Sequence, residues 1–207
     1  MVKHFVLWIL FLTSPLVFSQ TNVKIGNQVW MAKNLDVDKF RNGDVIPESK
    51  DKESWQKASD NEKPAWCYYE FDKLNGKKYG KLYNWHAVND PRILAPNGFH
   101  VPSVEEWTTL MNNLGGEQRA GDKMKDMTEW WGNRSNENDS SGFNALPGGY
   151  CYSDGTFNDI VAFGYWWSST EENEHDALAI SLFCNESKVY INKDDKFYGF
   201  SVRCIKD

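Results

Sequence analysis

The histidines offer little catalytic chemistry. After its first 19 residues the chain contains only His86, His100 and His175. None belongs to an H-E-x-x-H motif, and the G-x-S-x-G, Walker and dinucleotide-binding patterns are missing as well. His86 and His100 stand among aromatic and apolar residues, which favours a buried, hydrogen-bonded imidazole for each. We therefore predict no catalytic residue, no cofactor and no enzymatic activity.

Two acidic segments contain the oxygen atoms that Ca²⁺ prefers. Residues 153–159 alternate oxygen-bearing side chains around Gly155, but the terminal Glu of an EF-hand loop is missing, and an Asp-Gly turn also explains the pattern. Residues 171–176 hold the densest acidic run, which is equally typical of a solvated turn. The sequence therefore assigns no metal ligand.

Aromatic residues are unusually frequent. The chain has 12 Phe, 9 Tyr and 10 Trp, together 15% of its residues. Tyr150, Tyr152, Phe157, Trp166 and Trp167 flank loops rich in Gly, Ser and Asp. Aromatic faces beside carboxylates suit sugar rings, whose C–H faces are apolar and whose hydroxyls need partners. Because adjacent strand residues point to opposite faces, we expect at least one of the two tryptophans in the core.

The four cysteines are Cys67, Cys151, Cys184 and Cys204. They form no C-x-x-C pair and have no histidine at zinc-finger spacing, so a zinc site is not expected. In an oxidising compartment an even number of cysteines favours two disulfides, whose connectivity the spacing leaves open. The alternative is four buried thiols.

Residues 1–19 resemble a secretory signal peptide. Lys3 precedes an apolar run at 5–12, and Ser19 supplies a small residue for cleavage before Gln20. The run is shorter than the roughly 20 apolar residues that span a bilayer, although an uncleaved anchor is an alternative. We expect a secreted or cell-surface protein whose mature chain has no membrane span.

The amino-acid composition limits which classes of protein and partner are possible. The 207 residues include 23 Lys and Arg against 29 Asp and Glu, a net charge of −6, so nucleic acid is not an expected partner. An apolar content of 41% and a charged content of 25% are typical of a globular chain. No repeat or linker divides it, and residues 20–207 are predicted to be one domain.

The secondary-structure pattern indicates an α+β fold. Residues 23–32 read as a hairpin, and residues 41–63 as a surface loop with one helical turn. Ser103 and Glu106 form a capping box that begins a helix over 103–114, and a second helix is expected over 81–88. Alternating apolar residues predict a C-terminal antiparallel meander over 177–184, 189–191 and 200–204.

Five blocks of the sequence, in one order, resemble the Fibrobacter succinogenes major paralogous domain over residues 23–207. The blocks are 80–85 (GKLYNW), 94–107 (LAPNGFHVPS running into Glu106-Trp107), 142–150 (GFNALPGGY), 165–171 (YWWSSTE) and 199–204 (GFSVRC). The resemblance extends more loosely to the C-type-lectin-like superfamily, which includes the formylglycine-generating enzymes. It implies two helices, a twisted antiparallel sheet and adjacent N- and C-terminal strands. It also implies a secreted or surface protein of Bacteroidetes-type or Fibrobacter-type bacteria, and supplies no shared catalytic constellation.

The resemblance also implies a disulfide pairing. It places Cys67 and Cys204 in the family framework, whereas Cys151 and Cys184 look like additions. We therefore expect bridges between Cys67 and Cys204 and between Cys151 and Cys184.

If the lectin-like topology holds, the loop at 150–159 lies beside the segment at 167–176. Together they would form a ligand surface for a glycan or a partner protein. The expected ligand-binding residues are Tyr150, Tyr152, Asp154, Trp167, Glu171 and Glu172. The sequence thus predicts a secreted, non-catalytic binding or adhesion module, with a structural component of an extracellular assembly as the alternative.

Overall fold

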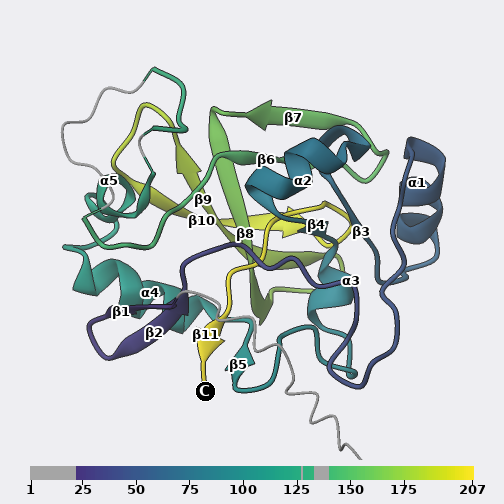
Figure 1. Ribbon diagram of the computed structural model, residues 1–207, viewed down its shortest axis with the longest axis horizontal. Coiled ribbons are helices and arrows are strands. Elements are labelled where there is room, and N and C mark those ends of the chain that lie inside the picture. Colours follow the sequence, from purple (N-terminus) through teal and green to yellow (C-terminus); the bar gives the residue numbers. More distant parts are fainter. Residues whose placement is uncertain (1–21, 127, 133–139) are drawn as a thin grey trace, which may run out of the picture.

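The computed structural model describes residues 22–126, 128–132 and 140–207 (Figure 1). The predicted signal peptide lies outside these residues. The α-helices are α1 (Lys52–Asp60), α2 (Lys73–Tyr79), α3 (Trp85–Val88), α4 (Val104–Asn113) and α5 (Ala120–Met124), and a 3₁₀ helix covers Tyr69–Phe71. The strands are β1 (Asn22–Ile25), β2 (Gln28–Met31), β3 (Trp66–Cys67), β4 (Leu82–Tyr83), β5 (Phe99–His100), β6 (Gly148–Cys151), β7 (Phe157–Ile160), β8 (Phe163–Glu171), β9 (Asp176–Phe183), β10 (Val189–Asp195) and β11 (Ile205–Lys206).

Helices and largely antiparallel sheets make this an α+β protein. The largest sheet has the strand order β10-β9-β8-β6-β7, and the long strand β8 runs through the middle of the molecule (Figure 1). Strands β8, β9 and β10 follow one another as an antiparallel meander, while β6 joins β8 in parallel. A second sheet has the order β1-β2-β11-β5, and β3 pairs with β4 alone.

The predicted N-terminal hairpin is confirmed. Strands β1 and β2 pair around a turn in which Gly26 has a φ of 59°, a conformation that favours glycine. Ile205 of β11 then pairs with Trp30 of β2. The C-terminal strand therefore lies beside the N-terminal hairpin (Figure 1).

The predicted helix at 103–114 is also confirmed, as α4. Its N-cap Ser103 and its N3 residue Glu106 form the expected capping box. The apolar stripe of this helix is buried: Trp107 has no exposed surface and packs against Trp30, with ring centroids 4.8 Å apart, and against Phe143 at 5.7 Å. Helix α4 thus anchors the N-terminal hairpin to the core.

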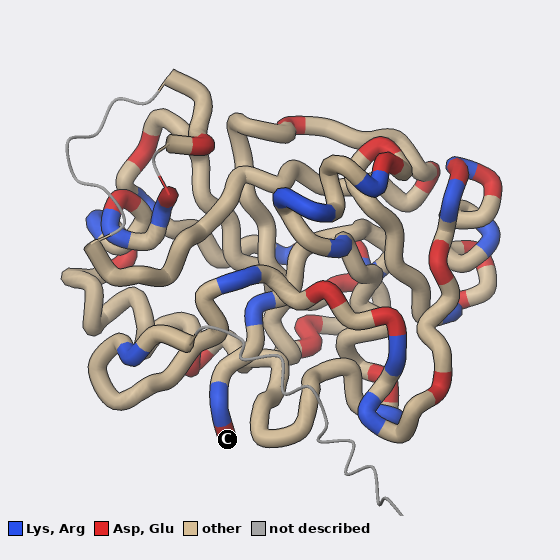
Figure 2. Tube along the Cα trace, in the orientation of Figure 1, with Lys and Arg blue, Asp and Glu red and all other residues tan. Residues whose placement is uncertain are grey.

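The region before β3 contains more helix than the sequence indicated. The expected single turn is the nine-residue helix α1, which begins at Asp51 with its own capping box and buries Trp55 completely. Lysines and acidic residues both lie along this helix (Figure 2). The apolar face of α1 was hard to recognise in the sequence because Trp55 is its one large apolar residue.

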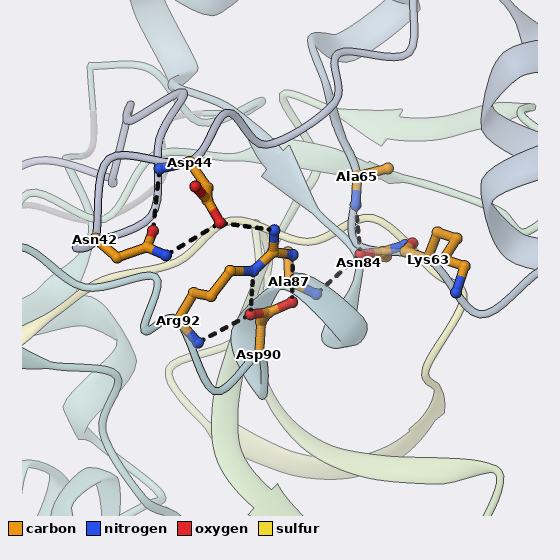
Figure 3. A network of polar contacts seen from close by, with 8 residues as sticks. All are labelled: Asn42, Asp44, Lys63, Ala65, Asn84, Ala87, Asp90 and Arg92. Carbon is orange, nitrogen blue, oxygen red and sulfur yellow. Dashed lines mark hydrogen bonds and ion pairs between the residues drawn. The ribbon is translucent and has the colours of Figure 1, made fainter.

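The predicted helix at 81–88 is wrong in its first half. Leu82 and Tyr83 form β4, and the helix α3 begins only after Asn84. The buried Asn84 side chain accepts hydrogen bonds from the backbone N–H groups of Ala65, at 3.0 Å, and Ala87, at 3.1 Å (Figure 3). It also donates to the carbonyl of Lys63 at 2.7 Å, so one amide caps α3 and fastens the chain before β3.

The expected third meander strand at 200–204 is wrong as well. Phe200 forms an isolated bridge with Tyr83, and Ser201 forms another with Trp166. This segment therefore crosses from the large sheet toward β4 instead of adding an edge strand to β10. In the residues that the structure describes there are five α-helices, and not the two that the resemblance implied.

His100 is more exposed than its sequence context indicated. Its side chain is 40% exposed, and its two ring nitrogens lie 2.8 Å from carboxylate oxygens of Glu106 and Asp207. Partial burial disfavours the charged imidazole, but the two hydrogen bonds outweigh that effect and raise the pKa of His100. His86 is half-buried, stacks on Phe197 and has a pKa lowered by burial, and no described residue is a hydrogen-bond partner of its Nε2.

A raised pKa of His100 in the folded chain makes its contribution to stability pH-dependent. That contribution is fully present below the ordinary imidazole pKa of 6.5 and is lost as the pH rises through the raised folded value. We expect His100→Gln to destabilise the protein more at pH of about 5.5 than at about 8.5, as urea unfolding at both pH values would measure. His175→Gln, at an exposed turn, is the matched control. A destabilisation independent of pH would mean that the ion pairs of His100 with Glu106 and Asp207 do not contribute to stability.

Candidate ligand-binding surface

Tyr150 and Tyr152 lie together, as expected for a shared surface. Both are half-buried. The Tyr150 hydroxyl donates to that of Tyr152 at 2.6 Å, and their ring centroids are 4.7 Å apart. Burial, followed by the contact with Tyr152, raises the pKa of Tyr150. The Tyr150 hydroxyl therefore stays protonated near neutral pH and keeps its hydrogen bond to Tyr152.

Asp154 is exposed, but its own turn occupies it. One carboxylate oxygen accepts from the hydroxyl of Thr156 at 2.6 Å and from its backbone N–H at 2.9 Å, while Lys52 of α1 lies 3.1 Å from the other oxygen. The Thr156 hydroxyl, its N–H and then Lys52 lower the pKa of Asp154 to about 2. The Asp-Gly turn explanation therefore suffices for this residue.

The structure corrects the assignment of Trp167 to the ligand surface. Its side chain has no exposed area, donates to the carbonyl of Tyr83 at 2.8 Å and packs against Phe200. Trp166 is equally buried, on the opposite face of β8, where it donates to Asn34 at 2.9 Å. Both tryptophans are core residues because β8 is covered on both faces at this point.

Glu171 and Glu172 each form an ion pair with a lysine near the end of β10. Glu171 lies 2.5 Å from Lys196, whose side chain is only 6% exposed, and Glu172 pairs with Lys193 of β10. Among the described residues no hydrogen bond or ring contact joins either glutamate to Tyr150 or Tyr152. The two glutamates therefore point to lysines and not to the tyrosine pair.

The predicted disulfides are absent. All four cysteines are thiols. Cys204 belongs to the apolar cluster around Trp167 and Phe200, whereas Cys67 and Cys151 belong to a smaller cluster around Trp55. Cys184 is half-buried against a third cluster, around Trp107. The pairings Cys67–Cys204 and Cys151–Cys184 would therefore join residues of different clusters.

A row of half-buried rings extends from Tyr152 across the large sheet. Successive ring centroids lie 4.7 Å (Tyr152 to Tyr150), 4.9 Å (Tyr150 to Tyr165), 6.3 Å (Tyr165 to Phe163), 4.6 Å (Phe163 to Phe183) and 4.9 Å (Phe183 to Tyr190) apart. Tyr198 flanks its first end, 5.2 Å from Tyr152. We call this set of seven residues the aromatic band.

Sheet register explains why these rings share one face. Ser181 of β9 is the register partner of both Tyr165 on β8 and Tyr190 on β10, and directly opposed residues point to the same side. The buried ring of Phe200 stacks on Tyr165 at 4.9 Å, and Tyr150, Tyr165 and Tyr198 pack against the apolar cluster to which Phe200 belongs. The first end of the band is therefore held against the core.

Two carboxylates flank the band. The pKa of Tyr165 is raised first by burial and then by Asp159 of β7 and Asp194 of β10, so both carboxylates lie near it. Burial, with Asp176 and Asp195 nearby, raises the pKa of Asp194 to about 6. One oxygen of Asp194 is buried, and no described residue donates a hydrogen bond to it. Two carboxylates thus lie beside the band, although this oxygen of Asp194 is itself shielded from solvent.

Sequence reasoning missed Tyr165, Tyr190, Tyr198 and Asp194. Alternation along β8 already placed Tyr165 on the same face as Trp167, and the same period placed Tyr190 with Asp194. The sequence does not show the register between strands, and this register is what brings Tyr165 close to Tyr190 and Asp194.

Other candidates are weaker. Within the described parts of the chain no group of three or more His, Cys, Asp or Glu side chains is arranged to hold a metal ion. An open cleft of about 400 Å³ lies between α2 and residues 32–36, and the ion pair of Lys78 with Glu129 is on its wall. Lysines, carboxylates and amides line most of it, and the aromatic residue in its wall, Tyr79, is only 5% exposed, so the cleft offers little stacking surface. None of the helices that the structure describes is long and apolar enough to cross a membrane.

Comparison with known proteins identifies the family of this chain. No curated protein and no solved structure matches the chain significantly. The family model of the Fibrobacter succinogenes major domain matches residues 23–206, nearly all of the part that the structure describes. The chain therefore belongs to the Fibrobacter succinogenes major domain family.

Proposed function

We propose that this protein is a secreted or cell-surface, non-catalytic module that binds a glycan through the aromatic band. The observation that carries the proposal is the unbroken row of half-buried rings on one face of the large sheet. Each ring offers an apolar face to the C–H face of a sugar, and the row matches a ligand that repeats along its length. The proposal includes export through a signal peptide at residues 1–19.

The polar groups around the band supply hydroxyl partners. Tyr150, Tyr152 and Tyr198 carry hydroxyl groups at one end, and the carboxylates of Asp159 and Asp194 lie near Tyr165. A sugar hydroxyl that donates to such an acceptor adds about 1 kcal/mol, or somewhat more when the acceptor is charged. Because the band is an open surface that would not enclose a sugar, we expect a dissociation constant between about 1 µM and 1 mM.

We also propose that the scaffold is C-type-lectin-like. Pairing of β11 with β2 supports this, since it places the C-terminal strand beside the N-terminal hairpin. The packing of α4 against that hairpin supports it as well. Fold alone does not determine function, so the binding proposal depends on the band.

Removing a ring at either end of the band tests the proposal. A panel of oligosaccharides and polysaccharides is first titrated against the purified protein. With the tightest binder, Tyr152→Ala and Tyr190→Ala are each expected to weaken binding about tenfold, because a stacked ring contributes on the order of 1 kcal/mol. The replacements Tyr152→Phe and Tyr190→Phe keep the ring and are expected to retain most of the affinity.

Glu171→Gln is the matched control on the other predicted segment. Glu171 pairs with Lys196 and has no contact with the band, so this variant should bind as the parent does. Melting temperatures of all variants show whether any loss reflects unfolding. Failure of every glycan on the panel to bind would sink the proposal and favour a structural role in an extracellular assembly.

A further inference from the structure

Two of the four cysteines face each other inside the core. Cys67 of β3 and Cys151 of β6 have no exposed surface and belong to one small apolar cluster with Trp55 and Leu82. The Cys151 thiol donates to the carbonyl of Tyr152 at 3.4 Å, and it lies near enough to Cys67 to raise the pKa of that thiol, after the larger effect of burial. The residues are 84 positions apart (151 − 67), so folding alone brings them together.

The backbone holds both cysteines in place. Cys67 is the register partner of Leu82 in β4. Cys151 exchanges two backbone hydrogen bonds with Gly199, at 3.0 and 2.7 Å. A Cβ on Gly199 would lie only 3.0 Å from the Cβ of Cys151 and from the Trp55 ring, so the glycine allows this close approach. Neither backbone segment can therefore move away without disturbing a strand contact.

We propose that Cys67 and Cys151 form a disulfide when the protein folds in an oxidising compartment, which covalently links β3 to β6. The two thiols lose two protons and two electrons as their S–H bonds break and the S–S bond forms. A disulfide-bearing oxidant accepts them, its own S–S bond breaks, and it leaves as two thiols. The cross-link does not depend on the ligand proposed above.

Burial of the two thiols determines when, during folding, this bond forms. Removal from water, followed by the contact with Cys151, raises the pKa of Cys67, so the thiolate that attacks a disulfide is scarce in the closed core. Both sulfurs are also out of reach of an oxidant in the folded chain. The bond therefore forms while the core is still open, and the folded dithiol oxidises slowly.

The link would support the aromatic band. Cys151 directly follows Tyr150 and precedes Tyr152, so a bridge to β3 fixes the strand that carries the first two rings of the band. Cys204 and Cys184 lie in other clusters and are expected to stay reduced.

The test is a disulfide map of protein refolded with reduced and oxidised glutathione. Free thiols are blocked with iodoacetamide in denaturant, the chain is digested without reduction, and the peptides are identified by mass spectrometry. We expect a cross-linked peptide pair containing Cys67 and Cys151, together with alkylated Cys184 and Cys204. If refolding fails, the same map is made on protein recovered from the periplasm of a secreting host.

Two variants separate the bridge from mere packing. Reduction should lower the melting temperature of the oxidised parent by several degrees but leave that of Cys151→Ala unchanged. Cys184→Ala, which keeps the pair, should respond to reduction as the parent does. Alkylation of both Cys67 and Cys151 in the oxidised parent, or a link from either one to Cys184 or Cys204, would overturn the proposal.

Discussion

Replacing Arg203 by Met is expected to lower the free energy of unfolding by about 3 kcal/mol or more. The Arg203 side chain is completely buried, and its guanidinium donates to the backbone carbonyls of Met31, Phe143 and Asn144. It also donates twice to Asn34, at 2.7 and 3.1 Å. Methionine fills similar space but donates nothing, so several buried acceptors lose their donor at once.

Chemical denaturation of the parent and the variant measures this difference. Arg92→Met is the matched control, because Arg92 is 36% exposed and forms ion pairs with the exposed Asp44 and the half-buried Asp90 (Figure 3). Such pairs contribute about 1 kcal/mol or less. Equal effects of the two substitutions would contradict the role given to Arg203 as the polar centre that joins β2 to residues 143–144.

Trp107→Ala is expected to destabilise the protein by about 3–5 kcal/mol, because it removes a large buried side chain and leaves a cavity. Trp107 has no exposed surface, and its ring contacts Trp30 and Phe143. The substitution therefore loosens α4 from both the N-terminal hairpin and the core. Denaturant unfolding monitored by circular dichroism gives the value.

Trp131→Ala is the control for the loss of an indole. This side chain is 71% exposed, so the same substitution should change stability by no more than about 0.5 kcal/mol. If Trp107→Ala were as mild as Trp131→Ala, the packing described for α4 would be incorrect.

Local signals predicted the parts of the fold in which the residues that matter are close along the chain. Ser103 and Glu106 are three residues apart, and their capping box begins α4 as expected. Strands β9 and β10 follow from alternation within single segments. The hairpin around Gly26 is equally local.

Prediction failed where a distant partner decides the local structure. Leu82 has a helical spacing with Trp85 and Val88, yet Leu82 and Tyr83 form β4 because Trp66 and Cys67 are available as a paired strand. The Phe200 segment alternates like an edge strand, but Tyr83 pairs with it from outside the large sheet. Tertiary pairing outweighed propensity in both cases.

The candidate site shows the same division. Tyr150 and Tyr152 lie side by side, as their spacing of two residues at the end of β6 indicates, and their role in binding stays a prediction. Trp167 was assigned to that surface because its sequence does not reveal the layer formed by Phe200 above it. The contact between Cys67 and Cys151 also joins distant segments, and no spacing rule predicts it.

Nuclear magnetic resonance mapping of the bound glycan tests the central claim most directly. Aromatic and backbone resonances are followed while the tightest glycan of the panel is added to the labelled protein. We expect the largest shifts at Tyr152, Tyr165 and Tyr190 on the aromatic band, with little change around the cleft beside α2. Shifts concentrated at that cleft, at Lys78 and Glu129, with the band unaffected, would contradict the account.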